Sequence, residues 1–145
     1  MFLDLDNFKP LNDEHGHNVG DLLLQEVALR IVRCVRAVDT VARFGGDEFV
    51  VLLSELGADK AESSVQANLI AEKVRTTLAA PYVLNVRNGS NGEALVQHQS
   101  TSSIGLVLFN NQKDSAGDIV KWADIAMYQA KTGGRNRVQF IDTSA

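Results

Sequence analysis

Apolar and polar residues alternate at the start of the chain, in MFLDLD (1–6), as they do in a β-strand that ends at a polar edge. The next stretch, NFKPLNDEHGHNVGD (7–21), is rich in Asn, Asp and Gly, and predicts one helical turn followed by a loop. Apolar residues such as Leu23 and Val27 then recur every three or four positions, which predicts an amphipathic helix over 21–38.

The middle of the chain predicts a β-hairpin followed by a second long helix. DTVARF (39–44) and EFVVLLS (48–54) are strand-like, and a Gly-Gly pair joins them. Residues 59–80 show the composition of a helix, which we expect to end before Pro81 because proline cannot continue a helix at that point.

The last third of the chain predicts two strands, a helix and a final strand. YVLNV (82–86) and STSSIGLVLF (100–109) are strand-like and lie on either side of RNGSNGE (87–93), whose Asn-Gly pairs indicate turns. A helix is expected over 114–134, closed by a Gly-Gly pair, and RVQFI (137–141) is a short strand. Strands and helices do not alternate regularly, so the pattern favours an α+β fold with a largely antiparallel sheet flanked by helices.

Composition supports a single domain over residues 1–145. With 45% hydrophobic residues, the chain can bury a core without disulfides or a structural metal, and the lone Cys34 is expected in that core. No apolar run approaches the roughly 20 residues of a membrane helix, so we expect no membrane contact by this domain. The formal net charge of -4 argues against nonspecific binding of nucleic acid.

Two carboxylates, Asp47 and Glu48, directly follow Gly45 and Gly46 at the predicted hairpin tip. A tight turn whose acidic side chains face water would explain this pattern. If the first strand is a neighbour in the sheet, however, Asp4 and Asp47 lie at one edge and can share a small hard cation. Mg²⁺ suits such a pair, because it binds few carboxylates and completes its shell with water and phosphate oxygens.

Other polar residues could complete a nucleotide site. Phe8 and Lys9 follow the first strand, where their backbone N–H groups could face phosphate. Lys131 and Arg135 flank the Gly-Gly pair at the end of the last helix. They could bind phosphate oxygens, or simply favour a helix C-terminus.

Asn12 and Asp21 are candidates for reading a base. One carboxylate can accept both the N1–H and N2–H₂ donors of guanine, which adenine lacks, and Asn12 can donate and accept. Asp21 could instead cap the helix that begins near it. His17, in GHNVGD, is expected to be a loop or capping residue.

Six motifs in order along nearly the whole chain resemble the GGDEF-domain family, the diguanylate cyclases. They are DLDNFKPLND, GHNVGD, RAVD, RFGGDEF, SSIG and ADIAMYQAKTGGRN. The resemblance implies a palm-like, ferredoxin-like core similar to that of nucleotide cyclases and polymerases. It also implies condensation of two GTP molecules into cyclic di-GMP with release of pyrophosphate.

The resemblance implies a role for each matching residue. Asp4, Asp47 and the Leu5 carbonyl would bind Mg²⁺ or Mn²⁺, and Glu48 would be the second acidic residue, near the attacking 3′-hydroxyl. The remaining roles are space for the nucleotide at Gly45 and Gly46, guanine recognition at Asn12 and Asp21, a phosphate loop at Phe8 and Lys9, and phosphate cations at Lys131 and Arg135.

The segment RAVD matches the RxxD inhibitory site of the family. Arg36 could pair with guanine O6 and N7, and Asp39 could accept from guanine N1 and N2. Product binding would then cause feedback inhibition by cyclic di-GMP. An Arg and an Asp three residues apart could also form an ordinary surface ion pair.

Partners follow from the resemblance. Each domain would hold one GTP, so catalysis requires a homodimer. The family segment DxLTxLxNR is absent before the first strand, which suggests a trimmed chain or an incomplete gene. We also expect a sensory or EAL domain in the native protein, and a location in the cytoplasm. One alternative is a catalytically weak or silent domain that binds GTP or cyclic di-GMP and regulates a neighbour; another is a structural dimerisation domain.

Overall fold

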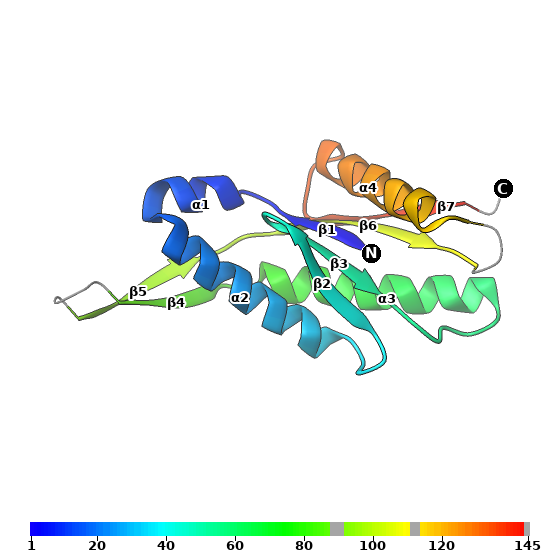
Figure 1. Ribbon diagram of the computed structural model, residues 1–145, viewed down its shortest axis with the longest axis horizontal. Helices are drawn as coiled ribbons and strands as arrows, with labels where there is room; N and C mark the ends of the chain where they lie inside the picture. Colours follow the sequence, from blue (N-terminus) through cyan, green and yellow to red (C-terminus); the bar gives the residue numbers. More distant parts are fainter. Residues whose placement is uncertain (88–91, 111–113, 144–145) are drawn as a thin grey trace.

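Strands and helices follow one another irregularly along the chain (Figure 1). The structure is a computed structural model that describes residues 1–87, 92–110 and 114–143. Its elements, in chain order, are β1 (Phe2–Leu5), α1 (Phe8–His15), α2 (His17–Cys34), β2 (Thr40–Gly45), β3 (Glu48–Leu52), α3 (Lys60–Ala79), β4 (Tyr82–Arg87), β5 (Glu93–His98), β6 (Ser102–Leu108), α4 (Ala116–Thr132) and β7 (Arg137–Asp142).

Five strands form the main sheet, in the order β2-β3-β1-β6-β7. Only the β6–β7 pair among them is parallel; the other neighbours are antiparallel. The α+β fold with a largely antiparallel sheet is therefore confirmed. The short strand β1 lies at the centre, and all four of its residues are buried.

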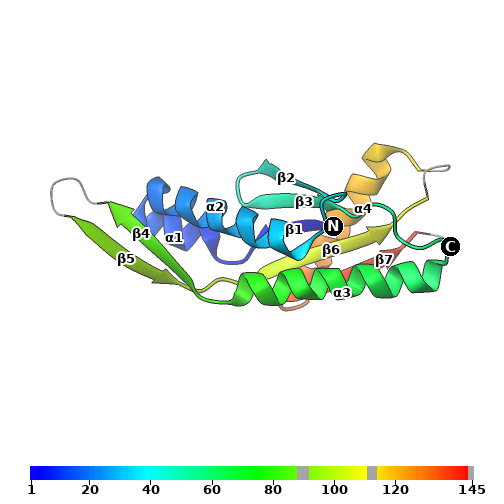
Figure 2. The same cartoon turned by 90° about the horizontal axis from the view of Figure 1, so that it is seen from below.

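Helices cover both faces of this sheet (Figure 2): α2 and α3 lie on one face and α4 on the other. Side chains alternate between the faces, so Leu3 and Leu5 enter the larger core with α2 and α3. Phe2 points the opposite way and packs in the smaller core with Ala123 and Met127 of α4. Cys34 is buried in the larger core, as predicted. No helix in the described part of the chain is long and apolar enough to cross a bilayer.

The boundaries of α3 and α4 agree with the sequence prediction because side chains fix their first turns. The Asp59 carboxylate accepts a hydrogen bond from the Glu62 backbone N–H at 2.9 Å. The Ser115 hydroxyl accepts one from the Asp118 N–H at 3.1 Å. Such caps can be recognised in sequence, because they depend on residues three positions apart.

The prediction of one turn and a loop over 7–21 is wrong. The stretch forms helix α1 and the start of α2. The two helices meet at Gly16, whose positive φ of 86° is a conformation that glycine adopts without strain. Leu11 is the only buried residue of α1, so the helix has no apolar periodicity from which it could be predicted. Helix α2 also ends earlier than predicted, at Cys34, and Val35 is already extended.

The sequence prediction also missed strand β5. We expected residues 82–86 to be followed by a turn and then by strand 100–109. Instead, β4 pairs with β5 in a separate two-stranded sheet that extends away from the body (Figures 1 and 2). The predicted Asn-Gly turns fall mostly on residues 88–91, outside the described residues. Strand β5 was inconspicuous because none of its residues is fully buried.

Helix α4 approaches the sheet closely at Gly105 of β6. A Cβ atom there would lie 2.2 Å from the Ala123 carbonyl oxygen and 2.4 Å from the Met127 nitrogen. Both atoms belong to the backbone of α4, so the helix could not yield without moving as a whole. Glycine at this position therefore sets the distance between α4 and the sheet.

Gly105→Ala should lower the free energy of unfolding by about 3 kcal/mol, because the added methyl overlaps helix backbone. Urea denaturation followed by circular dichroism would measure this. Gly117→Ala is the matched control: a Cβ there would meet nothing closer than the Ser115 hydroxyl oxygen at 3.8 Å. Equal stability of the two variants would contradict the close approach.

Candidate active site

The strand register brings Asp4 next to the tip of the β2–β3 hairpin. Strands β1 and β3 are neighbours, and Asp4 lies opposite Glu48. The Leu5 N–H also donates to the Asp47 carbonyl oxygen at 3.3 Å. The expectation that the first strand and the hairpin share one edge is therefore confirmed. Asp47 and Glu48 are half-buried, so water is only partly available to solvate their charges.

Asp4 is a buried carboxylate with incomplete hydrogen bonding. It is 5% exposed, and burial together with the neighbouring Asp47 raises its pKa to about 6, although Lys131 opposes this shift. The Lys131 ammonium pairs with Oδ2. Oδ1 is buried without a hydrogen-bond partner among the described residues. An oxygen of this kind normally faces a ligand, a water molecule or an ion.

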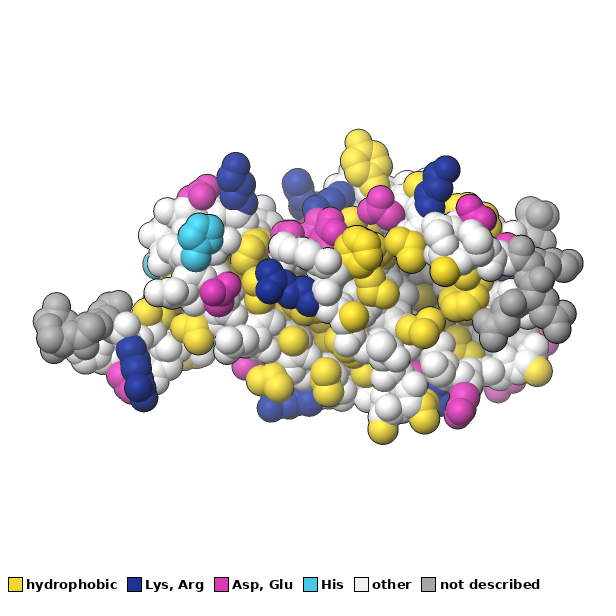
Figure 3. Space-filling view, in the orientation of Figure 1, with side chains coloured by type: hydrophobic (Ala, Val, Ile, Leu, Met, Phe, Trp, Pro, Cys, Tyr) yellow, Lys and Arg dark blue, Asp and Glu magenta, His cyan; other side chains and the backbone are white. Residues whose placement is uncertain are grey.

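Glu48 belongs to the same group of charges. Burial raises its pKa, as do the negative charges of Asp4 and of Asp124 on α4, while Lys131 acts in the opposite direction. Acidic and basic side chains lie together on the face between α1 and α4 (Figure 3). Carboxylates therefore outnumber cations here, and an added positive charge would relieve their repulsion.

The donor set suits a hard divalent cation bound together with phosphate. Within the described ranges, no three His, Cys, Asp or Glu side chains are grouped as a complete metal site. Asp4 and Asp47 offer two carboxylates, and one Asp4 oxygen is buried with no hydrogen-bond partner among the residues that the structure describes. Mg²⁺ accepts so small a protein share when water and phosphate oxygens supply the remaining ligands.

The glycines at the hairpin tip leave open space beside the carboxylates. A Cβ atom on Gly45 or Gly46 would meet nothing within 4 Å. Gly46 also has a φ of 52°, and its carbonyl accepts from Arg43 Nε at 2.9 Å. The tight-turn interpretation therefore explains Gly46, and both glycines are exposed, so the space beside them is open to solvent.

Phe8 and Lys9 form the first turn of α1 rather than the loop we expected. Their position remains suitable for binding phosphate, because the first N–H groups of a helix have no partner within the helix. This turn starts three residues after Leu5 and so lies close to the edge that carries Asp4.

Asn12 and Asp21 are placed by the contact of α1 with α2. The Asn12 side chain lies against Gly20, where a Cβ would be 1.8 Å from its Oδ1. That oxygen is buried without a partner among the described residues. Asp21 is exposed inside α2, five positions after Gly16, so the capping interpretation of Asp21 is wrong. Asp21 lines a cleft of about 440 Å³ between α2 and the hairpin, with Leu24, Gln25, Ala28, Val32, Val41, Arg43 and Phe49.

Lys131 and Arg135 lie at the end of α4. Lys131 contacts Asp4, so its role is not limited to the dipole of its helix. Gly133 ends the helix, and the Arg135 N–H donates to the Ala130 carbonyl at 3.0 Å. Arg135 is exposed on this turn and has a φ of 61°. The turn thus presents Arg135 a few residues beyond the lysine that pairs with Asp4.

The sequence analysis missed two acidic residues of this region. Asp6 is 2% exposed and accepts three hydrogen bonds, two of them from hydroxyls and one from a backbone N–H. Alternation along MFLDLD could have placed it on the same face as Asp4. Asp124 precedes Lys131 by seven positions, a spacing that places both on one side of α4.

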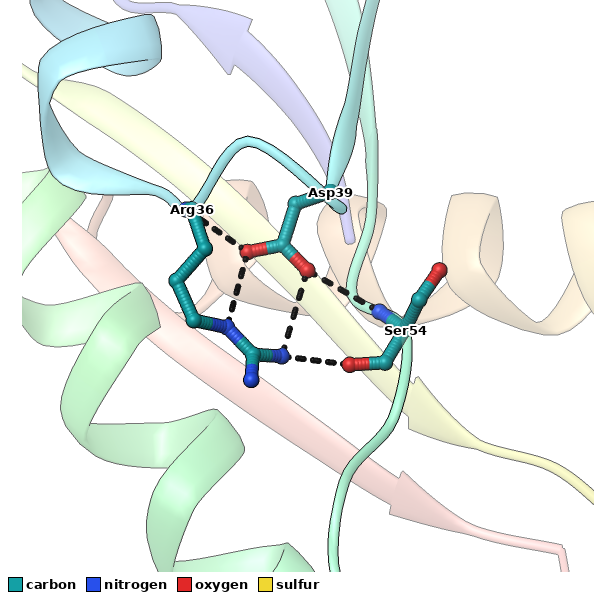
Figure 4. Close-up of polar contacts among 3 residues, drawn as sticks. All are labelled: Arg36, Asp39 and Ser54. Carbon is teal, nitrogen blue, oxygen red and sulfur yellow. Dashed lines mark hydrogen bonds and ion pairs between the residues drawn. The ribbon is translucent and has the colours of Figure 1, made fainter.

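The RxxD residues form a closed network with Ser54 (Figure 4). The Asp39 carboxylate accepts from the Arg36 N–H at 2.8 Å, from the Arg36 guanidinium and from the Ser54 N–H at 3.0 Å. Arg36 Nη2 also donates to the Ser54 carbonyl. Burial opposes ionisation of Asp39, yet the hydrogen bonds from Arg36 and Ser54 lower its pKa.

This network changes the expectation for Asp39. Its side chain is fully buried and both oxygens accept internal hydrogen bonds, while half of the Arg36 side chain is exposed. In this structure Asp39 therefore holds Arg36 and has no free oxygen for a guanine. Arg36 and Asp39 do form an ion pair, but with the Asp39 side chain buried it is not the ordinary surface pair that the spacing alone suggested. The pair lies at the base of the β2–β3 hairpin, at the opposite end from Gly45 and Gly46.

Comparison with known proteins identifies the family. The family model described as "Diguanylate cyclase, GGDEF domain" matches residues 1–137. The chain therefore belongs to the GGDEF family. Among solved structures, it resembles the GGDEF domain of YfiN (TpbB) from Pseudomonas aeruginosa, with a TM-score of 0.79 and 37% identity, covering 96% of this chain and 78% of that one.

Curated relatives that are similar in sequence support the same family. The bifunctional diguanylate cyclase/cyclic di-GMP phosphodiesterase MucR of Pseudomonas aeruginosa is 41% identical over 99% of this chain and 19% of MucR. Diguanylate cyclase A of Treponema denticola is 38% identical over 95% of this chain and 33% of that protein. The chain thus spans about a fifth to a third of the length of these relatives.

Asp4→Asn should stabilise the metal-free domain at neutral pH. The folded protein holds the Asp4 proton up to about pH 6, whereas the ordinary pKa is 3.8. The folded state thus binds more protons between these values, so stability falls as the pH rises through this range. Asn does not ionise and so avoids this loss of stability. Urea denaturation at pH 7 in EDTA should show a free energy of unfolding that is roughly 1–2 kcal/mol higher in Asp4→Asn than in the unmodified protein.

The gain should shrink as the pH is lowered toward 4, where Asp4 is protonated in the folded state. Asp13→Asn, at an exposed position of α1, is the control and should have no comparable effect. A gain from Asp4→Asn that does not vary with pH would contradict the raised pKa.

Proposed function

We propose that this domain condenses two molecules of GTP into cyclic di-GMP and releases pyrophosphate. The observation that carries the proposal is the pairing of Asp4 with the hairpin tip in a chain of the GGDEF family. Asp4 retains a buried oxygen that has no partner in the described part of the chain, and Lys131 pairs with its other oxygen. Burying an incompletely hydrogen-bonded carboxylate lowers the stability of the folded domain, and this supports a role for the site in binding charged ligands.

The acidic edge would hold the metal and the reacting hydroxyl. Asp4, Asp47 and the Leu5 carbonyl would bind Mg²⁺ or Mn²⁺, which when bound offsets charge on the triphosphate. Glu48 lies beside Asp4 and would face the attacking 3′-hydroxyl. Its raised pKa makes it a better proton acceptor than an ordinary carboxylate at the same distance.

The phosphates would lie between α1 and α4. The backbone N–H groups of Phe8 and Lys9 would receive phosphate oxygens at the start of α1. Lys131 and Arg135 would stabilise the charge that develops on the leaving pyrophosphate. Lys131 neutralises Asp4 in this structure, so its ammonium becomes available to phosphate once Asp4 is neutralised by another cation.

Guanine recognition would fall to Asn12 and Asp21. The Asp21 carboxylate is exposed beside the cleft and could accept from both N1–H and N2–H₂ of guanine. The buried Asn12 Oδ1 lacks a partner among the described residues and could accept a further donor. Open space at Gly45 and Gly46 would accommodate the nucleotide between these two regions.

Catalysis would require two domains. Each holds one GTP, and each 3′-hydroxyl must reach the α-phosphate of the other nucleotide, so two sites must face each other in a homodimer. A sensory or EAL domain elsewhere in the native protein and a cytoplasmic location remain predictions from the sequence.

Product inhibition would act through Arg36. Its guanidinium is half-exposed and held in one orientation by Asp39 and Ser54, so it is prepared to pair with guanine O6 and N7. A structural neighbour, the GGDEF domain of DgcB from Caulobacter crescentus, was solved in complex with c-di-GMP at 32% identity and a TM-score of 0.75. Asp39 would contact the ligand only after releasing its internal hydrogen bonds.

Asp47→Ala should abolish synthesis, because it removes one of the two metal carboxylates while its backbone contact with Leu5 can persist. The purified protein would be incubated with GTP and Mg²⁺ at increasing protein concentration, and nucleotides separated by chromatography. Asp13→Ala is the control for loss of an exposed carboxylate. Cyclic di-GMP made by Asp47→Ala would contradict the assignment. Binding of GTP without any product in the unmodified protein would favour the regulatory alternative.

Arg36→Ala should weaken feedback inhibition. The inhibition constant of added cyclic di-GMP should rise at least about fivefold, since a bidentate contact with guanine contributes roughly 1–3 kcal/mol. Initial rates measured over a series of product concentrations would show this. Arg33→Ala, one turn earlier on α2 and exposed, is a matched control. An unchanged inhibition constant would exclude Arg36 from the product site.

A further inference from the structure

A second buried carboxylate lies beside the proposed active site without being part of its chemistry. Asp6 follows β1, two residues after Asp4, and is 2% exposed. Its Oδ1 accepts from the Ser103 hydroxyl at 2.8 Å. Its Oδ2 accepts from the Thr101 hydroxyl at 2.6 Å and from the Asn136 backbone N–H at 3.1 Å. These bonds occupy both oxygens, so Asp6 is not available to a nucleotide or a metal.

The turn held by Asp6 has an unfavourable backbone conformation. Gly134, Arg135 and Asn136 have consecutive φ values of 123°, 61° and 46°. Side chains other than glycine rarely adopt the left-handed region, and two of them do so here in succession. Such a conformation persists only when contacts from the surroundings hold it.

Two tethers hold this turn from different parts of the fold. Asp6 binds the Asn136 N–H from the end of β1. Arg75 of α3 donates from Nη1 to the Asn136 side-chain oxygen at 2.8 Å and pairs with Glu72. Arg135 lies directly before Asn136, so the tethers fix the backbone from which its side chain projects.

We propose that Asp6 is a positioning residue for triphosphate binding. It holds the 133–136 turn so that Arg135 faces the phosphates, and it does so without touching the nucleotide. Strand β1 thus supplies a carboxylate for the acidic edge at Asp4, and the residue directly after the strand, Asp6, supplies an anchor for the cationic turn. This role rests on the proposed binding of GTP, because Arg135 acts on phosphate.

The test separates phosphate binding from general stability. Two ligands that lack the reacting 3′-hydroxyl would be titrated into the protein with Mg²⁺. Binding of 3′-deoxy-GTP would be measured by calorimetry, and binding of 3′-deoxyguanosine by changes in NMR chemical shift. Asp6→Ala should weaken 3′-deoxy-GTP binding about tenfold, which corresponds to roughly 1.4 kcal/mol. Binding of 3′-deoxyguanosine should stay within about twofold, because that ligand carries no phosphate.

Asp6→Asn should recover most of the affinity for 3′-deoxy-GTP. Its amide oxygen can accept from Thr101 and from the Asn136 N–H, and its amide nitrogen can donate to the Ser103 hydroxyl oxygen. Thr101→Val gives a milder variant if Asp6→Ala does not fold: it removes one donor to Oδ2 and should weaken 3′-deoxy-GTP binding two- to fourfold.

A double-mutant cycle tests the route through Arg135. If Asp6 acts by placing Arg135, Asp6→Ala should weaken 3′-deoxy-GTP binding less than twofold in an Arg135→Ala background. Ser63→Ala is the control for general loss of stability, because it removes a buried hydrogen bond to the Gly57 carbonyl. It should leave the ratio of the affinities for 3′-deoxy-GTP and 3′-deoxyguanosine unchanged.

The outcomes distinguish the two proposals. If the unmodified protein does not prefer 3′-deoxy-GTP to 3′-deoxyguanosine, the proposed GTP site is wrong, and the role of Asp6 fails with it. If that preference is present but survives Asp6→Ala or Thr101→Val undiminished, only the role of Asp6 is overturned. A full tenfold effect of Asp6→Ala in the Arg135→Ala background would likewise overturn it.

Discussion

The burial of Asp4 in the central strand and of Asp6 directly after that strand is the constraint on which the proposed site depends. Both carboxylates are almost inaccessible to water, yet their surroundings differ. Asp6 receives three hydrogen bonds, whereas Asp4 keeps one oxygen without a partner among the described residues and relies on Lys131 for its other oxygen. A satisfied carboxylate supports structure, and an unsatisfied one favours a ligand. Two residues of the same type, two positions apart, therefore differ in whether they have an oxygen left to offer a ligand.

Much of this arrangement could be predicted from the sequence, because it follows from local patterns. The β2–β3 hairpin, α3 and α4 are specified by turn residues, caps and apolar periodicity. The adjacency of Asp4 and the hairpin tip required only that two predicted strands be neighbours. Family motifs then assigned roles that no single residue could have indicated.

The remainder depended on contacts between distant segments. The helix α1 buries Leu11 alone, so periodicity could not reveal it. Strand β5 has no fully buried residue and is defined by its pairing with β4. The hydrogen bond from the Ser54 N–H to Asp39 also joins residues that lie 15 positions apart across a hairpin. The spacing of residues within RAVD gives no indication of this bond. Local sequence predicts elements, whereas the use of each polar atom is decided by the tertiary fold.

The central position of β1 has a consequence for how the chain reaches this structure. Strand β1 is synthesised before every other described element of this domain, but its neighbour β6 comes much later, and Asp6 and Ser103 are 97 residues apart. The middle of the sheet therefore cannot close until most of the domain has been synthesised. Proteins dominated by such distant pairings fold slowly, because the entropy of closing a long loop is lost before the contact forms. Until then, strand β1, all of whose residues are buried in the folded domain, has an unpaired edge, and this interval is when the nascent domain is most exposed to aggregation.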